Sequence, residues 1–343
     1  MQRTLDDLLA DYRLRGALEG AVADAIAAIS VAGAALQAEI VKGSTWRSKA
    51  GADVNAGGDV QQELDVTADR LYLAAARTGG LASYASEEQD EPLVLDPHAL
   101  VALAIDPLDG SSNIDTNVPI GTIFSLMPVA RGADAAKAFF QPGSAQLAAG
   151  FVIYGPRTAL VLSLGEGTRI FLYDHDAASY VEIADHVAIP QGKHEYAINA
   201  SNYRYWDEPV RAFVDDCIAG SDGPMSADYN TRWIASLVAE AYRILGRGGV
   251  FLYPGDIRKG YRLGRLRLIY EANPIAFVVE QAGGAATTGN RRILDIVPES
   301  LHQRTPLIFG SIDHVEHIDR YFRDPGSIVD RMPLFGRRGL LRA

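Results

Sequence analysis

The sequence predicts an α/β (α+β) fold, arranged as two domains or as one large unit, and three observations support this. The chain has 343 residues, of which 48% are hydrophobic, so it can bury a large core. Several long stretches show helical periodicity, whereas short continuous apolar runs between them are typical of buried strands. Charged residues make up 22% of the chain, as in ordinary folded proteins and unlike disordered ones.

Helices are predicted where apolar residues recur every three or four positions and a turn signal follows. These stretches are Leu18–Val41, Gln61–Arg77, Glu208–Ala219, Trp233–Leu245, Asn273–Glu280 and Asp313–Phe322. We expect Asn273 to cap its helix, with Pro274 in the first turn, and Asp313 to cap the last helix.

Strands are predicted at the short apolar runs between the helices. These runs are Leu100–Ile105, Gly121–Val129, Phe151–Tyr154, Thr158–Leu164, Thr168–Tyr173, Gly249–Tyr253 and Arg267–Tyr270. The third, fourth and fifth are separated by glycine-containing turns and should form an antiparallel meander. A turn signal at Pro190–Gly192 predicts two domains, residues 1–190 and 191–343.

Charge and cysteine content limit the partners and the compartment. The net charge is −11 and the isoelectric point is about 5.1, which argues against a general nucleic-acid-binding protein. A single cysteine, Cys217, excludes a disulfide within the chain and is expected to pack as a small apolar residue. Asp24, Gln37 and Glu39 interrupt the most apolar stretch, Gly20–Ile40, and no signal-peptide pattern is present. We therefore expect a cytoplasmic protein without membrane partners.

The segment most informative about chemistry is DPLDGSSN, residues Asp106–Asn113, which follows a predicted buried strand. Asp106 and Asp109 could converge on one hard cation at the strand end. Gly110 permits a tight turn, and the serines and asparagine after it offer N–H groups and hydroxyls to a phosphate. A metal beside such an anion cradle indicates phosphoryl hydrolysis. The alternative is that Asp109-Gly110 is a turn that only connects two elements. Such turns are common, whereas the full eight-residue string is much more specific.

Four other acidic residues are ambiguous when each is considered by its local sequence alone. Glu87 and Glu88 precede further acidic residues and are typical of a solvated charge run. Glu271 lies between a predicted strand and a predicted helix, where a lone glutamate is usually at the surface. Asp65 lies near a predicted helix start and could serve only the helix dipole.

Longer motifs resemble the fructose-1,6-bisphosphatase family. They are DPLDGSSNID (Asp106–Asp115), GTIF (Gly121–Phe124), FLYP (Phe251–Pro254) and RLRLIYEANPIAFVVEQAGGAATTG (Arg265–Gly289). The match runs from about Asp59 to about Gly289 and is longer than the core motif shared with inositol monophosphatases. The resemblance implies the layered α-β-α-β-α sandwich of this superfamily.

The resemblance also implies a role for individual residues. The implied metal ligands are Glu87, Glu88, Asp106, Asp109, Glu271 and the carbonyl of Leu108. Glu88 and Asp65 match the pair that orients or deprotonates the attacking water. The implied substrate-binding residues are Asp109, Gly110, Ser111 and Ser112 for the 1-phosphate, and Asn199, Arg232, Tyr253 and Arg265 around the sugar and the 6-phosphate.

The activity implied is magnesium-dependent hydrolysis of fructose 1,6-bisphosphate to fructose 6-phosphate and phosphate. Two or three Mg²⁺ ions, or Mn²⁺, would bind each subunit of a homotetramer, in which Arg232 reaches a neighbouring site. Three departures from the family are visible. Arg265 stands where lysine is frequent, and Trp233 replaces a tyrosine. Leu100 and Val101 replace the Lys-Tyr pair of AMP-inhibited members, and for this reason we expect weak or absent AMP inhibition.

Two alternatives of function remain open from the sequence. A sedoheptulose-1,7-bisphosphatase, or an enzyme that accepts both bisphosphates, would need a pocket that differs by only one carbon unit. A non-catalytic sugar-phosphate sensor should have a broken set of ligands, but every implied carboxylate is present. Gluconeogenesis and carbon fixation both need this reaction, so the pathway is open as well.

Overall fold

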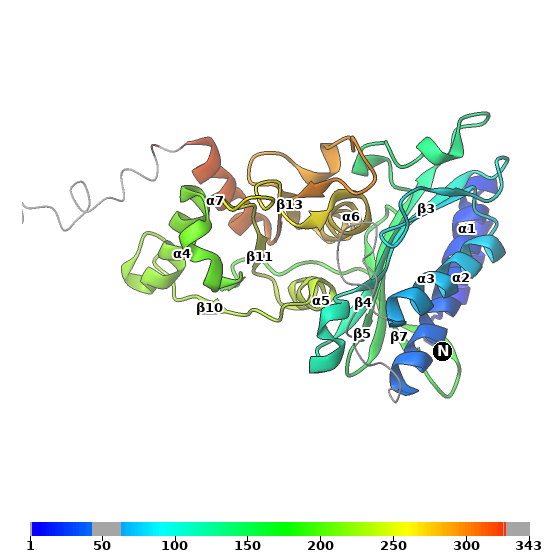
Figure 1. Ribbon diagram of the computed structural model, residues 1–343. Helices are drawn as coiled ribbons and strands as arrows, with labels where there is room; N and C mark the ends of the chain where they lie inside the picture. Colours follow the sequence, from blue (N-terminus) through cyan, green and yellow to red (C-terminus); the bar gives the residue numbers. More distant parts are fainter. Residues whose placement is uncertain (1, 43–62, 325, 327–343) are drawn as a thin grey trace, which may run out of the picture.

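The structure, a computed structural model, describes residues 2–42, 63–324 and 326 as five stacked layers. In Figure 1 the layers follow one another as three helices, an eight-stranded sheet, two helices, a five-stranded sheet and two further helices. This is the α-β-α-β-α sandwich that the family resemblance implies. The two middle helices are buried against both sheets, so the elements that meet there can bring distant segments together.

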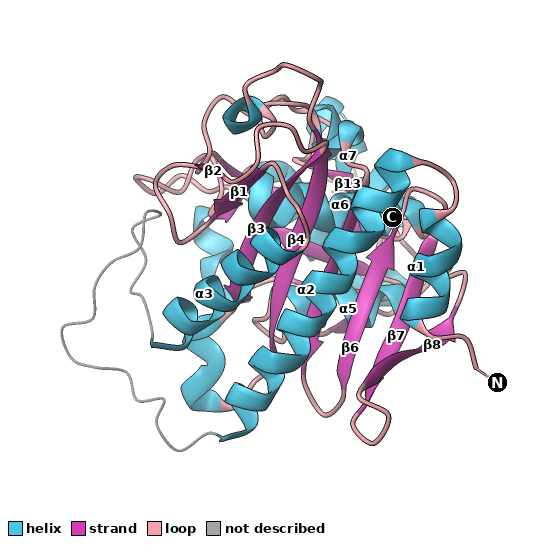
Figure 2. Ribbon diagram, turned by 90° about the vertical axis from the view of Figure 1, so that its right-hand side faces the viewer, coloured by secondary structure: helices cyan, strands magenta, loops and turns pink. Residues whose placement is uncertain are grey.

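The outer helical layer consists of α1 (Leu5–Arg13), α2 (Ala17–Lys42) and α3 (Glu63–Thr78). Figure 2 shows α2 and α3 in front of the larger sheet. The predicted start of α3 at Gln61 lies outside the described residues. By length and composition α2 could cross a membrane, so the prediction that Asp24, Gln37 and Glu39 disqualify this stretch is wrong. Half of its most apolar window is buried inside the fold, where its aliphatic side chains join the core cluster beneath the sheet.

The larger sheet has the strand order β2-β1-β3-β4-β5-β6-β7-β8. Its strands are β1 (Ser83–Ser86), β2 (Leu93–Val94), β3 (Val101–Asp109), β4 (Ile120–Pro128), β5 (Ala148–Tyr154), β6 (Thr158–Ser163), β7 (Thr168–Asp174) and β8 (Ser179–Ala184). From β3 to β8 every pair is antiparallel, which includes the predicted meander, whereas β1 pairs with β3 in parallel. The carboxyl end of β1 therefore lies beside that of β3.

The middle layer holds α5 (Leu237–Arg247) and α6 (Asn273–Gln281) between the sheets. The smaller sheet has the order β10-β9-β11-β15-β13 and is covered on its outer face by α4 and α7. These elements are β9 (Glu195–Ala197), α4 (Glu208–Ala219), β10 (Asn230–Thr231), β11 (Val250–Tyr253), β13 (Ala285–Thr287), β15 (Leu307–Gly310) and α7 (Ile312–Arg323). A separate pair joins β12 (Leu266–Arg267) to β14 (Arg304–Thr305).

Several predicted helix or strand ends differ from the structure. The predicted strand 267–270 ends at Arg267, because the chain then makes a π-helical turn over Leu268–Ala272 that continues into α6. Asn273 is therefore inside the helical segment and does not cap it. Asp313 likewise lies in the first turn of α7, which Ser311 precedes.

The predicted helix 233–245 instead begins at Leu237. Ser236 caps it, because the serine hydroxyl accepts a hydrogen bond from the N–H of Ala239. The N-terminus of α5 is thereby fixed next to the larger sheet, beside the end of β3.

Candidate active site

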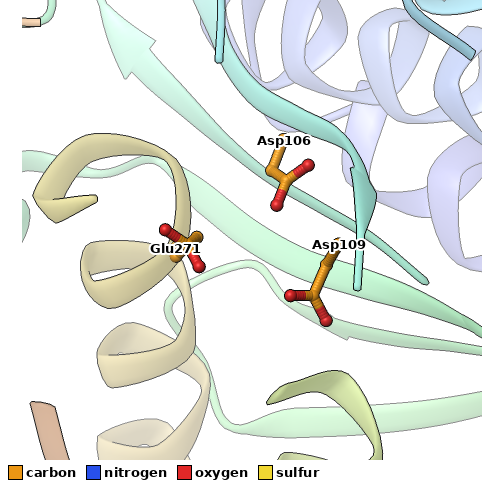
Figure 3. Close-up of side chains that lie close together, drawn as sticks. All are labelled: Asp106, Asp109 and Glu271. Carbon is orange, nitrogen blue, oxygen red and sulfur yellow. The ribbon is translucent and has the colours of Figure 1, made fainter. Parts of the chain in front are cut away.

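A bulge in β3 brings the two aspartates of the acidic turn to one side of the sheet. Asp106 pairs with Ile123 and Asp109 with Gly121, so two residues of β3 lie opposite the single residue Thr122 of β4. In a regular strand, residues three apart point to opposite faces. The extra residue changes this alternation, and the carboxylates of Asp106 and Asp109 lie on the same side (Figure 3).

Glu271 completes the cluster from the middle layer of the fold. The π-helical turn before α6 directs this residue toward β3, and Figure 3 shows it facing both aspartates. Ligand oxygen atoms of Asp106, Asp109 and Glu271 all lie within 4.8 Å of one another, and the three residues are only 5–7% exposed. Segments more than 160 positions apart in sequence thus present three buried carboxylates to one point.

Glu87 and Glu88 follow β1 directly and lie beside this cluster. The N–H of Glu87 donates to the carbonyl of Ile105, one residue before Asp106. Glu87 is 8% exposed, so the interpretation of a solvated charge run is wrong for it, whereas Glu88 is half-buried. Its N–H donates to the Ser86 hydroxyl.

Arg267 is a residue of the site that the sequence reasoning did not single out. It is 6% exposed, its Nη2 lies 3.2 Å from Oε1 of Glu87, and its backbone N–H donates to Oε2 of Glu271 at 2.5 Å. A buried arginine needs carboxylate partners. The sequence offered a signal for Arg267, because this arginine lies in the run Arg265–Glu271, which ends at an implied metal ligand.

Burial and mutual repulsion disfavour the charged forms of these carboxylates. Burial raises the pKa of Asp106 well above its usual range, and the charges of Glu87, Asp109, Glu271 and Glu88 add to the shift. Burial also raises the pKa of Asp109 to about 6, against the opposing effect of a hydrogen bond from the Val238 N–H. The pKa of Glu271 is raised chiefly by burial and by Glu87. Buried carboxylates that repel one another fit a site for hard divalent cations.

Two glycines shape the surroundings of Asp109, one in the turn after it and one on β4. Gly110 has φ +81°, a conformation that favours glycine, and precedes a short 3₁₀ turn, Ser111–Thr116. A Cβ on Gly121 would lie 2.7 Å from the side chain of Val238, so this glycine allows α5 to approach β4. Consequently the Val238 N–H, at the N-terminus of α5, donates to Oδ2 of Asp109 at 3.1 Å. Ser111 is half-buried and Ser112 is exposed, so both are open to a ligand.

A second feature is a polar cavity of about 140 Å³, which brings together three of the predicted substrate-binding residues. Asn199, Tyr253 and Arg265 line it, together with Tyr261 and Arg258. The Arg265 guanidinium lies over the Tyr261 ring at 5.1 Å, and the described residues offer it no carboxylate partner. An exposed cation in a polar cavity fits an anionic ligand.

Arg232 and Asp65 are the remaining predicted site residues. Arg232 does not line the cavity; its side chain is half-exposed, and its Nε lies 3.7 Å from Glu195. The neighbouring Trp233 stacks parallel to Tyr253 with 6.2 Å between ring centroids, so this tryptophan packs against the cavity wall. Asp65 is buried on α3, which packs against β1 and β3.

Two family models together match most of the chain. Residues 9–185 match a family model described as the N-terminal domain of fructose-1-6-bisphosphatase, and residues 189–323 match the C-terminal domain. The chain belongs to the fructose-1,6-bisphosphatase family. A fructose-1,6-bisphosphatase class 1 of Rhizobium meliloti (strain 1021) is 60% identical over 291 residues, which are 84% of this chain and 83% of that protein.

Two further family members extend the match to nearly the whole chain. A fructose-1,6-bisphosphatase class 1 of Rhodopseudomonas palustris (strain HaA2) is 52% identical over 344 aligned residues, covering 100% of this chain and 98% of that protein. The crystal structure of Leishmania major fructose-1,6-bisphosphatase in holo form matches with a TM-score of 0.84 and 30% identity, over 94% of this chain and 99% of that one. The predicted family, layered fold and phosphatase class are confirmed.

Because this fructose-1,6-bisphosphatase family member has carboxylates with raised pKa, its metal-free stability should depend on pH. At Asp109 the folded protein binds more of a proton than the unfolded chain does above about pH 4, so the contribution of this carboxyl group to stability falls as the pH rises through its pKa, about 6. Mg²⁺ requires deprotonated ligands and should raise the melting temperature more at pH 8 than at pH 5.5. Thermal melts with EDTA and with Mg²⁺ measure this; equal Mg²⁺-induced shifts at both pH values would contradict it.

Proposed function

We propose that this protein hydrolyses fructose 1,6-bisphosphate to fructose 6-phosphate and phosphate, with Mg²⁺ as the cofactor. The observation that carries the proposal is the convergence of Asp106, Asp109 and Glu271, with oxygens within 4.8 Å, in a chain of the fructose-1,6-bisphosphatase family. The cavity around Arg265 supports a substrate with a second anionic group, since it offers an arginine without a carboxylate partner among the described residues.

The donor set fits a hard cation. Asp106, Asp109, Glu271, Glu87 and Glu88 offer only oxygen donors, which suit Mg²⁺ or Mn²⁺ and disfavour softer metals. Together with the Leu108 carbonyl they would hold two or three ions per subunit. Bound cations would neutralise charge on the phosphoryl group and make a nearby water more acidic.

The protein's own groups position the substrate and move the proton. Gly110, Ser111 and Ser112 would hold the 1-phosphate next to the carboxylates. Glu88, with Asp65, would accept a proton from the attacking water as its oxygen forms a bond to phosphorus. The bond between phosphorus and the C1 oxygen breaks, and that oxygen takes up a proton to give fructose 6-phosphate. Positioning and charge neutralisation supply most of the rate enhancement.

At the other end of the substrate, Arg265 would bind the 6-phosphate, with Asn199 and Tyr253 against the sugar. Replacing Arg265 by methionine should raise KM by about tenfold or more, because charge-assisted hydrogen bonds are lost, and should lower kcat less. Steady-state kinetics measure the split. Arg262→Met, at an exposed neighbouring arginine, is the matched control. An unchanged KM in Arg265→Met would remove this residue from the binding site.

Assembly, location and domain division are further parts of the proposal. The half-exposed Arg232, which does not line the cavity of its own chain, suits a homotetramer in which it reaches a neighbouring site. A single cysteine without a partner suits the cytoplasm. The two family matches meet between residues 185 and 189, which supports a division into residues 1–190 for the metal and 1-phosphate and 191–343 for the sugar.

The deciding experiment is phosphate release from fructose 1,6-bisphosphate and sedoheptulose 1,7-bisphosphate, with Mg²⁺, with Mn²⁺ and after chelation. We expect metal-dependent release with the first substrate as the better one. Preference for the seven-carbon substrate would change the proposed specificity. No release from either substrate in the presence of metal would overturn the proposed activity.

A further inference from the structure

A chain of three buried hydroxyl groups runs beneath the acidic turn. The Thr122 hydroxyl lies 2.9 Å from the Pro107 carbonyl and 3.1 Å from the hydroxyl of Tyr154. The Tyr154 hydroxyl in turn lies 3.0 Å from that of Tyr72. Thr122 and Tyr72 are 0% exposed and Tyr154 is 6% exposed, so the three side chains are buried.

The Pro107 carbonyl, at the end of this chain of hydroxyl groups, determines the direction of every hydrogen bond in it. A carbonyl can only accept, so Thr122 must donate its single hydroxyl hydrogen to Pro107. Tyr154 must then donate to Thr122, and Tyr72 to Tyr154. Burial raises the pKa of Tyr72 to about 12 and that of Tyr154 well above its usual range, so both remain neutral donors at physiological pH. Hydrogen bonds aligned in this way strengthen one another in a dry interior.

The chain ends at the bulge that forms the metal site. Pro107 lies between Asp106 and Leu108, where the pairing of β3 with β4 shifts, and Thr122 is the β4 residue opposite the shift. Ile105 and Leu108 belong to the same core cluster although they are three residues apart, which shows that the alternation changes here. The Thr122 hydroxyl therefore supplies a partner for a carbonyl at the irregular step of the sheet.

The other end of the chain lies on the helix that carries a predicted catalytic residue. Tyr72 follows Asp65 by seven positions on α3, so the two lie on the same buried face of the helix. We propose that the hydroxyl chain Tyr72–Tyr154–Thr122 is a positioning device, which fixes the bulge so that Asp106 and Asp109 converge and ties α3 to it. The inference rests on the metal-binding part of the proposed function.

The test measures Mn²⁺ binding by calorimetry, without substrate, alongside thermal stability and kcat. Thr122→Val keeps the shape of the side chain and removes the hydroxyl, and should weaken Mn²⁺ binding by about tenfold or more, as loss of a group that orients metal ligands does. Thr122→Ser should restore binding. Tyr154→Phe and Tyr72→Phe leave the bond to Pro107 intact and should have progressively smaller effects.

Thr168→Val is the matched control, because the Thr168 hydroxyl is equally buried and donates to the Val278 carbonyl at 2.7 Å, away from the acidic cluster. It should lower the melting temperature without changing Mn²⁺ binding. Unchanged Mn²⁺ binding in Thr122→Val, or an equal loss in Thr168→Val, would overturn the inference. If Thr122→Val does not fold, unchanged binding in Tyr154→Phe overturns it and weakened binding supports it. Wild-type protein that binds Mn²⁺ but hydrolyses neither bisphosphate refutes the proposed activity alone.

Discussion

Asp106→Asn is expected to lower kcat for fructose 1,6-bisphosphate by about a hundredfold or more and, in metal-free buffer at pH 8, to raise the melting temperature. Both effects follow from one charge. The carboxylate is buried among other carboxylates, which raises its pKa, so its ionised form destabilises the metal-free fold. The same charge is needed to hold a cation and to stabilise the transition state, where one electrostatic contact accounts for losses of this size.

The two measurements separate a role in the site from a role in the fold. Asp90→Asn is the control, because Asp90 is an exposed carboxylate near Glu88 and its replacement should change neither quantity. If Asp106 served only the fold, Asp106→Asn would lower the melting temperature together with kcat. Near-wild-type turnover in Asp106→Asn would show that this carboxylate does not take part in the reaction.

Local sequence patterns located individual helices and strands where those patterns are strong, and the layered order came from the family resemblance. Long helical periodicity located α2 and α4 within one residue at each end, and continuous apolar runs located β3, β4 and the meander. Local signals failed where tertiary packing decides. Arg267–Tyr270 is an apolar run with high strand propensity, but the chain winds into a π-turn there because Glu271 is buried against β3.

The site was predicted through residue identity more than through periodicity. By charge pattern alone Glu87 belongs to a solvated run, whereas in three dimensions it is buried and pairs with Arg267. The bulge in β3 was equally hidden. Strand alternation alone would have put Asp106 and Asp109 on opposite faces, and nothing local to DPLDGSSN identifies Thr122 as the residue opposite the extra position.

Arg267 helps the metal-free fold to tolerate several buried carboxylates. Four of them, Glu87, Asp106, Asp109 and Glu271, are less than 9% exposed, and the Arg267 guanidinium lies 3.2 Å from the first. Its attraction lowers the pKa of Glu271, in opposition to burial and to the charge of Glu87. Arg267 therefore offsets part of the repulsion that divalent cations would otherwise have to offset.

Arg267→Met should accordingly destabilise the metal-free protein by about 3–5 kcal/mol, the usual cost of removing one partner from a buried ion pair. Mg²⁺ should recover much of this loss, because the cations compensate the same carboxylates. Urea unfolding with EDTA and with Mg²⁺ measures both quantities. Glu87→Gln added to Arg267→Met should recover stability without metal.

Arg169→Met is the control, since Arg169, on β7 of the larger sheet, pairs with Glu182 at 2.6 Å and is more exposed than Arg267. Its loss should be about 1 kcal/mol or less and independent of Mg²⁺. If Mg²⁺ stabilised Arg267→Met no more than wild type, Arg267 would not compensate the charges of the buried carboxylates. Arg267 would then act through packing alone, and the carboxylates would have to be held neutral by protons.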